Sequence, residues 1–241
     1  SMRNAITFVL IIITLASCGQ IKGSGYTRII YSHSVKDSFE LYITVPKSYD
    51  SNQVYAVFYY FDANLKSGKK LREMIQQPAF ASRVNKTIFV GIGHRGDFHE
   101  LRRRDFILPS IRQGDTSGLA VNYGQAANFY NFMKNELMPI ITKAYKTDPL
   151  NNSIMGHSLG GLFVFYSLFR NDSLFRNYYA LSPSLWVDGY SIYRFNKLNG
   201  LYAPPRNLYF STGSLEIVNR IKAGTEEMSA FLQKEQYPGI S

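Results

Sequence analysis

The chain has 241 residues, of which 45% are hydrophobic and 18% are charged, and this composition excludes an intrinsically disordered protein. The formal net charge is +10, but Lys and Arg are scattered apart from the clusters at 69–72 and 102–104. No RNA- or DNA-binding motif accompanies these clusters, so we predict no nucleic-acid partner. A basic surface is nevertheless compatible with an anionic substrate.

The first 18 residues have the pattern of a bacterial lipoprotein signal peptide. Arg3 precedes an apolar run at 6–13, which leads into Leu15-Ala16-Ser17-Cys18. The run is too short for a transmembrane helix. The L-A-S-C sequence resembles a lipobox, in which the cysteine is lipidated, and Cys18 is the only cysteine of the chain. We expect a signal at 1–18, a tether at 19–25 and a lipid anchor on Cys18 that holds the protein in the cell envelope. The alternative is a buried N-terminal strand with an incidental thiol.

The segment from residue 26 to residue 92 reads mainly as strands. Residues 26–33 and 39–45 have β-rich, partly alternating patterns, which predict an antiparallel pair at a sheet edge. Residues 54–61 and 87–92 are apolar on both faces, as buried central strands are. Between these two strands, residues 68–83 are predicted to form a helix.

The rest of the chain alternates strands with helices. A helix is expected over 124–145, divided or kinked by Pro139. Further strands are predicted before Gly156, at 178–181 and at 208–211, and further helices at 162–169 and 221–234. Alternation of this kind predicts βαβ units. We therefore expect one α/β domain at 26–241, with a mostly parallel central sheet, helices on both faces and an antiparallel N-terminal edge.

The most specific motif is Gly156-His157-Ser158-Leu159-Gly160-Gly161, a G-x-S-x-G sequence between a short apolar strand and a helix. This is the context of a nucleophile elbow, and it predicts Ser158 as the nucleophile of an ester hydrolase. The oxyanion hole should use the N–H of Leu159 and an N–H from the loop after strand 54–61, at Ala63. A glycine-rich loop that carries a serine by chance is the alternative.

Such a serine needs an acid and a base, and along the chain of an enzyme with a nucleophile elbow the acid follows the serine and the histidine follows the acid. Glu216 fits the acid, because it follows a predicted strand and should share the sheet rim with Ser158. No histidine follows Glu216, and the four histidines are His33, His94, His99 and His157. Use of His94 or His99 would reverse the expected chain order. These two residues with Asp97 and Glu100 lack the spacing of a zinc site, so we predict neither a metal nor a cofactor.

The C-terminal residues suggest a strand that has only begun. A helix after Glu216 should lead to one more strand, and residues 239–241 read as its start. We expect the last strand and helix of the fold to be lacking here, and the general-base histidine to lie beyond residue 241. A degenerate, non-catalytic version of the fold is the competing expectation.

Together these residues resemble the esterase D-type esterases of the α/β-hydrolase superfamily, a group that includes ferric enterobactin and salmochelin esterases. The similarity spans roughly residues 26–237, and the elbow and Ser182-Pro183-Ser184-Leu185-Trp186 are its most specific parts. It also includes the sequences at 42–49, 58–62, 90–93 and 104–109. The resemblance implies an α/β-hydrolase fold, with Ser158 as nucleophile and Glu216 as acid. It also implies that Arg102 to Arg104 lie near the mouth, where family members meet anionic substrate.

The expected function is hydrolysis of a carboxylic ester through an acyl-enzyme, on a siderophore or a carbohydrate-linked ester. Arg102 and Arg103 are the candidate substrate-binding cations. Trp186 is either an aromatic wall for substrate or part of the core. The sequence leaves two other functions open: a non-catalytic lipoprotein that binds a ligand, and an acyltransferase in which a hydroxyl replaces water.

Overall fold

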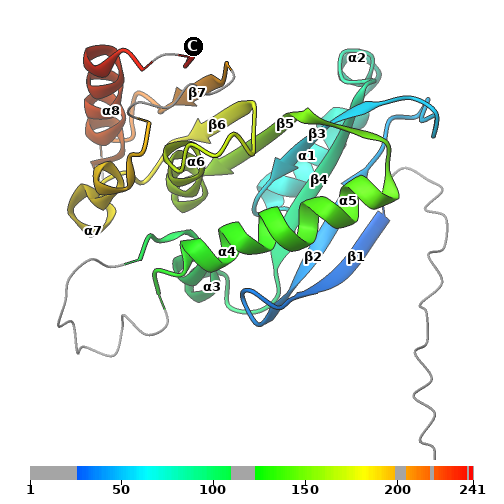
Figure 1. Ribbon diagram of the computed structural model, residues 1–241, viewed down its shortest axis with the longest axis horizontal. Coiled ribbons are helices and arrows are strands. Elements are labelled where there is room, and N and C mark those ends of the chain that lie inside the picture. Colours follow the sequence, from blue (N-terminus) through cyan, green and yellow to red (C-terminus); the bar gives the residue numbers. More distant parts are fainter. Residues whose placement is uncertain (1–25, 110–122, 199–204, 218–219, 238, 241) are drawn as a thin grey trace, which may run out of the picture.

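The computed structural model describes residues 26–109, 123–198, 205–217, 220–237 and 239–240 (Figure 1). The expected signal peptide, Cys18 and the tether lie outside these residues. Within the described ranges, no helix is both long and apolar enough to cross a membrane.

A seven-stranded sheet forms the centre of the molecule, in the order β1-β2-β4-β3-β5-β6-β7. Its first two strands are antiparallel to their neighbours, and the other five run parallel to one another. This confirms the mostly parallel sheet with an antiparallel N-terminal edge. The strands are β1 Tyr26–Ser32, β2 Asp37–Thr44, β3 Tyr55–Tyr60, β4 Thr87–His94, β5 Thr147–His157, β6 Asn177–Leu181 and β7 Asn207–Ser211.

Both faces of the central strands are apolar because helices cover both of them. Along β3, Val57 and Tyr59 join the main core, whereas Tyr60 joins a second, smaller cluster on the opposite face. The smaller cluster packs against helices α1 (Lys66–Gln76) and α2 (Pro78–Ala81). The main core takes in the remaining long helices, including α6 (Leu159–Phe169) and α8 (Ile221–Glu235). The fold is the expected three-layer α/β arrangement.

A proline divides one of two predicted helices, while the other continues past its proline through a π-helical turn. The helix expected at 68–83 is the pair α1 and α2, because Gln77 precedes Pro78 and adopts an extended backbone with ψ 137°. The helix expected at 124–145 consists of α4 (Ala126–Phe132), a π-helical turn (Met133–Leu137) and α5 (Met138–Ala144). Pro139 lies in the first turn of α5, where its missing N–H is tolerated. Figure 1 shows α4 and α5 as one nearly continuous rod.

Helix α3 (Phe98–Phe106) was not expected from the sequence, and neither was the short helical segment after Trp186. Asp97 caps α3 by accepting a hydrogen bond from the N–H of Glu100 at 2.9 Å. The Asp97-x-x-Glu100 spacing is a capping-box pattern that could have revealed this helix. Its position matters because it places Arg102 and Arg103 beside the elbow, whereas Arg104, also expected near the mouth, pairs with Asp105 and Asp37.

The last described residue lies beside the open side of β7. Ile240 forms a parallel bridge with Arg206, the residue before β7, and the N–H of Arg206 donates to Gly239 O at 2.7 Å. This is the position at which the sequence predicts a further strand to begin.

Candidate active site

Ser158 lies in a tight turn between β5 and α6. Its backbone is in the positive-φ region (φ 58°, ψ −116°), and its N–H donates to Leu181 O at 2.9 Å. Gly156 makes this turn sterically accessible, because a Cβ at that position would lie 2.3 Å from the backbone of Gly160. The chain thus passes directly from a buried strand into a helix N-terminus, as the motif predicts.

The loop after β6 brings two serines to the elbow. Ser184 is buried, and its Oγ lies 3.1 Å from the Oγ of Ser158. The N–H of Ser184 also donates to Ser158 O at 3.1 Å. Ser182 has positive φ (44°) and points its hydroxyl toward Glu216. The S-P-S sequence therefore links the candidate nucleophile to the candidate acid.

One carboxylate oxygen of Glu216 receives three hydrogen bonds. Its Oε2 accepts from Ser182 Oγ at 2.7 Å, from Thr212 Oγ1 at 2.9 Å and from the N–H of Gly213 at 2.8 Å. The Ser182 hydroxyl, followed by the Gly213 N–H and the Thr212 hydroxyl, lowers the pKa of Glu216 below its ordinary value. None of the described residues donates to Oε1. The carboxylate is held in place while one oxygen stays available.

A cavity of about 560 Å³ opens over Ser158. Helix α3 contributes Phe98, His99, Arg102 and Arg103 to its wall, and the segment after β6 contributes Ser184 and Trp186. Trp186 is 37% exposed, which places it in the cavity wall and not in the core. Of the two roles that the sequence leaves for this residue, the structure favours the aromatic wall.

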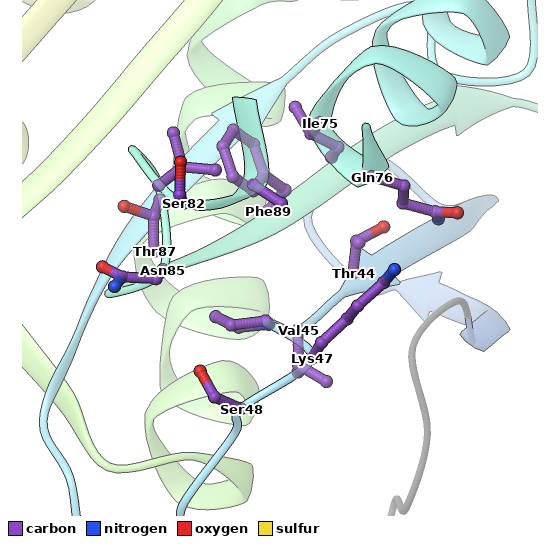
Figure 2. A pocket seen from close by; sticks show the side chains of 13 residues that line it. Thr44, Val45, Lys47, Ser48, Ile75, Gln76, Ser82, Asn85, Thr87 and Phe89 are labelled. Carbon is purple, nitrogen blue, oxygen red and sulfur yellow. The ribbon is translucent and has the colours of Figure 1, made fainter. Parts of the chain in front are cut away.

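A second cavity, of about 290 Å³, lies at the other end of the sheet (Figure 2). Its walls include Thr87 and Phe89 at the amino end of β4, together with Thr44, Val45 and Lys47. Ligand sites in parallel sheets lie at the carboxyl ends of the strands, where Ser158 is found. The cavity over Ser158 is accordingly the candidate active site.

The two candidate substrate-binding arginines differ in their surroundings. The side chain of Arg103 is half exposed, and it approaches Glu100 at 3.6 Å. Arg102 is buried: its Nε donates to Asp62 Oδ1 at 3.0 Å and its Nη2 donates to His157 O at 2.9 Å. The guanidinium of Arg102 therefore lies in the wall of the cavity and is already bound to protein groups.

The expected oxyanion donor at Ala63 is wrong. The N–H of Ala63 donates to Ile92 O at 3.1 Å, which ties the loop to β4 and leaves that donor occupied. The preceding residue, Asp62, has positive φ (57°), and among the described residues its N–H meets no acceptor. The N–H of Leu159 begins α6 and likewise has no acceptor in the described part of the chain.

None of the four histidines, all of which are described, hydrogen-bonds to Ser158. His94 is the last residue of β4, where it is buried against Phe39, Phe106 and Phe129, and its Nε2 lies 3.0 Å from Asp105 Oδ2. His99 is exposed in the cavity wall. His33 is exposed after β1, whereas His157 is exposed directly before Ser158 and makes a minor contribution to lowering the pKa of Glu216. Within the described ranges, no group of three His, Cys, Asp or Glu side chains could hold a metal ion.

Sequence reasoning missed three residues of this site: Asp62, Ser182 and Ser184. Asp62 and Ser182 each follow a strand, but the sequence indicates no role for either. Their functional signal is backbone conformation, since both have positive φ without being glycine, and such outliers gather at functional sites. Ser184 is recognisable only from the fold, because 26 residues separate it from Ser158.

Comparison with known families gives one match over most of the chain. The family model "Putative esterase" matches residues 32–213.

Individual proteins agree with that match. The chain is 29% identical over 202 residues to the ferri-bacillibactin esterase BesA of Bacillus subtilis. The aligned region covers 78% of this chain and 70% of BesA. It is 34% identical over 102 residues to the siderophore triacetylfusarinine C esterase of Aspergillus fumigatus, over 41% of this chain and 34% of that protein. Among solved structures, the BES protein from Bacillus cereus superimposes with a TM-score of 0.77 at 28% identity, over 92% of this chain and 87% of that one.

Proposed function

The chain belongs to the esterase family of the α/β-hydrolase superfamily, and from this premise we propose that it hydrolyses siderophore esters with Ser158 as nucleophile. The observation that carries the proposal is the elbow itself. Ser158 has a positive-φ backbone, lies at the start of α6 and opens into a cavity of about 560 Å³. Glu216 follows β7 and is linked to this serine through the S-P-S loop.

In the proposed reaction, the Oγ of Ser158 attacks the ester carbonyl and its proton passes to a general base. The N–H groups of Leu159 and Asp62 stabilise the oxyanion of the tetrahedral intermediate. The alcohol leaves with a proton from the base, and an acyl-enzyme forms on Ser158. Water then attacks the acyl group with the aid of the same base, which releases the acid and restores the serine.

Glu216 serves as the acid that orients the base. It is ionised at neutral pH, as stabilisation of a protonated imidazole requires, and its lowered pKa extends the ionised form to more acidic pH than for an ordinary glutamate. Its free Oε1 is the acceptor for the N–H of that imidazole. Ser184 in turn fixes the resting position of the Ser158 hydroxyl.

Two features support a siderophore ester as substrate. Two of the relatives are named as a ferri-bacillibactin esterase and a siderophore esterase. The cavity wall presents Arg103 and His99 beside Trp186, so an anionic aromatic substrate would meet complementary groups there.

We also propose that Cys18 carries a lipid that holds the domain at the cell envelope. Support comes from the L-A-S-C sequence and the apolar run before it. Mass spectrometry of the N-terminal peptide from the native membrane fraction tests this, and an unmodified or uncleaved Cys18 peptide would contradict it.

Turnover of a p-nitrophenyl ester tests the esterase proposal and identifies the base. Four proteins are compared: residues 1–241, the product of the gene read past codon 241, and the Ser158→Ala variant of each. We expect Ser158-dependent hydrolysis in the form that contains the base, and a rate lower by orders of magnitude without it. His99 is the one described histidine that lines the cavity, so His99→Ala tests whether this residue acts as the base. If neither form shows hydrolysis that Ser158→Ala abolishes, the esterase proposal fails.

A further inference from the structure

Arg102 connects three parts of the candidate active site, and we infer that it is a positioning residue and not a substrate-binding one. It holds the loop after β3 and the nucleophile elbow in register, so that the two oxyanion donors point at one atom. The inference rests on the proposed function, because it assigns those donors to Leu159 and Asp62.

The contacts of Arg102 are directed at protein groups. Its side chain is only 9% exposed, and Asp62, its ion-pair partner, is 8% exposed. One guanidinium bridges Asp62 Oδ1 and His157 O, at 3.0 and 2.9 Å. The rings of Phe98 and Phe106 lie 4.7 and 5.6 Å from its central carbon, so the cation is also bounded by aromatic faces. Two of its three nitrogens, Nε and Nη2, are therefore bound to protein groups, and a substrate anion that took their place would have to compete with a buried carboxylate.

The two residues that Arg102 joins belong to the two strained turns of the site. Asp62 has φ 57°, and His157 immediately precedes Ser158, which has φ 58°. Such conformations persist only where surrounding contacts fix them. Arg102 supplies such a contact to both turns at once, from a third element, α3. Loss of the guanidinium would leave the Asp62 carboxylate buried without its cation, and the loop would move to solvate it.

The shape of the side chain matters as well as its charge. A guanidinium presents N–H groups in a fixed planar fork, so one side chain reaches a carboxylate and a carbonyl simultaneously. A lysine at 102 would keep the charge but lack this fork. We therefore expect Arg102→Lys to resemble Arg102→Ala in its catalytic defect while retaining more of the wild-type stability.

The test compares Arg102→Ala, Arg102→Lys and Arg103→Ala on a neutral and an anionic ester, p-nitrophenyl acetate and mono-p-nitrophenyl succinate. If Arg102 positions the oxyanion donors, both of its variants lose kcat about 10²–10³-fold on both esters, with little change in KM. Arg103 lies on the same helix and lines the same cavity, so its variant is the matched control. Arg103→Ala should raise KM for the anionic ester alone. A defect of Arg102→Ala confined to KM for the anionic ester would overturn the inference, as would full activity on both.

Hydrogen exchange separates this inference from the proposed function. In Arg102→Ala, amide exchange should accelerate in the peptides that cover 61–65 and 156–160, and it should not in Arg103→Ala. Exchange that is unchanged in Arg102→Ala would contradict the positioning role whatever the turnover. If the wild type shows no Ser158-dependent hydrolysis but this exchange pattern is found, the esterase proposal fails, and the role of Arg102 in holding the two turns stands.

Addition of methylguanidinium to Arg102→Ala should restore part of kcat, which a general loss of folding would not allow.

Discussion

At the scale of single residues, hydrogen bonds fix the candidate acid, Glu216, through one carboxylate oxygen and leave the other oxygen free among the described residues. Three donors converge on its Oε2 and lower its pKa. The sequence singled out Glu216 as the candidate acid because it follows a predicted strand after the elbow. It did not predict the donors, since Ser182 lies 34 residues away and reaches Glu216 only through the pairing of β6 with β7.

Ser182→Ala should shift the acid limb of the pH–rate profile toward higher pH. With the Ser182 hydroxyl present, the carboxylate stays ionised until the pH falls through its lowered pKa. Without this donor the pKa rises, and protonation inactivates the site at a higher pH. The measurement is kcat/KM for a p-nitrophenyl ester between pH 3 and 8. Ser214→Ala, at an exposed position on the loop after β7 that carries Glu216, should leave the limb in place. An unmoved acid limb in Ser182→Ala would show that Glu216 does not govern it.

At the scale of elements, the glycines of the elbow are not equivalent. A Cβ on Gly156 would lie 2.3 Å from the Gly160 backbone, and a Cβ on Gly161 would lie 3.0 Å from Pro183 Cα. A Cβ on Gly160 would make only ordinary contacts, the nearest at 3.4 Å to Phe61. The motif therefore requires Gly156 for close packing of β5 against α6, while the position of Gly160 has space for a side-chain methyl group.

Alanine substitutions should reproduce that order in stability. We expect Gly156→Ala to lower the free energy of unfolding by about 1–3 kcal/mol or more, because backbone must shift. Gly160→Ala should be nearly neutral or stabilising by about 0.5–1 kcal/mol, since alanine favours the helix. Urea denaturation followed by circular dichroism gives both values. Equal destabilisation by the two substitutions would show that the turn is not packed as described.

Helix α3 is held by buried charges, and these charges position the cavity wall. Asp105 is fully buried, lies 3.0 Å from His94 Nε2 and accepts two hydrogen bonds from Arg104, which also pairs with Asp37 at 2.7 Å. The sequence did not predict the burial of His94. It follows from the packing of three elements around the imidazole, because α3 supplies Asp105 and Phe106, β2 supplies Phe39 and α4 supplies Phe129.

Asp105→Ala should destabilise the protein by about 3–5 kcal/mol, because it leaves two polar partners in the interior without their acceptor. Arg103→Ala, at a half-exposed position on the same helix, should cost no more than about 0.5 kcal/mol. Chemical denaturation of the two variants side by side tests this. A small effect of Asp105→Ala would mean that the helix is anchored chiefly by its apolar contacts.

At the scale of the whole molecule, the exposed side of β7 leaves apolar surface uncovered. Tyr209 is 54% exposed and stacks on Tyr179 at 5.0 Å, and Leu181 beside them is 37% exposed. A sheet edge with an apolar face tends to self-associate. We expect residues 1–241 to show concentration-dependent association in sedimentation velocity, and Tyr209→Lys to reduce it. A monomer at all concentrations up to about 100 µM would contradict this expectation.

The sequence predicted a mostly parallel sheet with an antiparallel N-terminal edge, and it placed Ser158 and Glu216 on one rim, because these expectations follow from alternation and from a local motif. It could not predict which backbone donors are free: the N–H of Ala63 is taken by Ile92 and that of Asp62 is not, a difference set by pairing across the sheet. It also placed Arg102 at the mouth. The burial of that residue depends on Asp62, which lies 40 positions earlier.

The most direct test of the account is covalent labelling of the serine itself. After prolonged incubation with diisopropyl fluorophosphate, intact-mass spectrometry of the wild type should show a single diisopropyl phosphoryl adduct, and peptide mapping should place it on Ser158. Ser158→Ala should show none. A protein that stays unlabelled, or one in which Ser158→Ala is labelled as fully as the wild type, would contradict the assignment of Ser158 as the nucleophile.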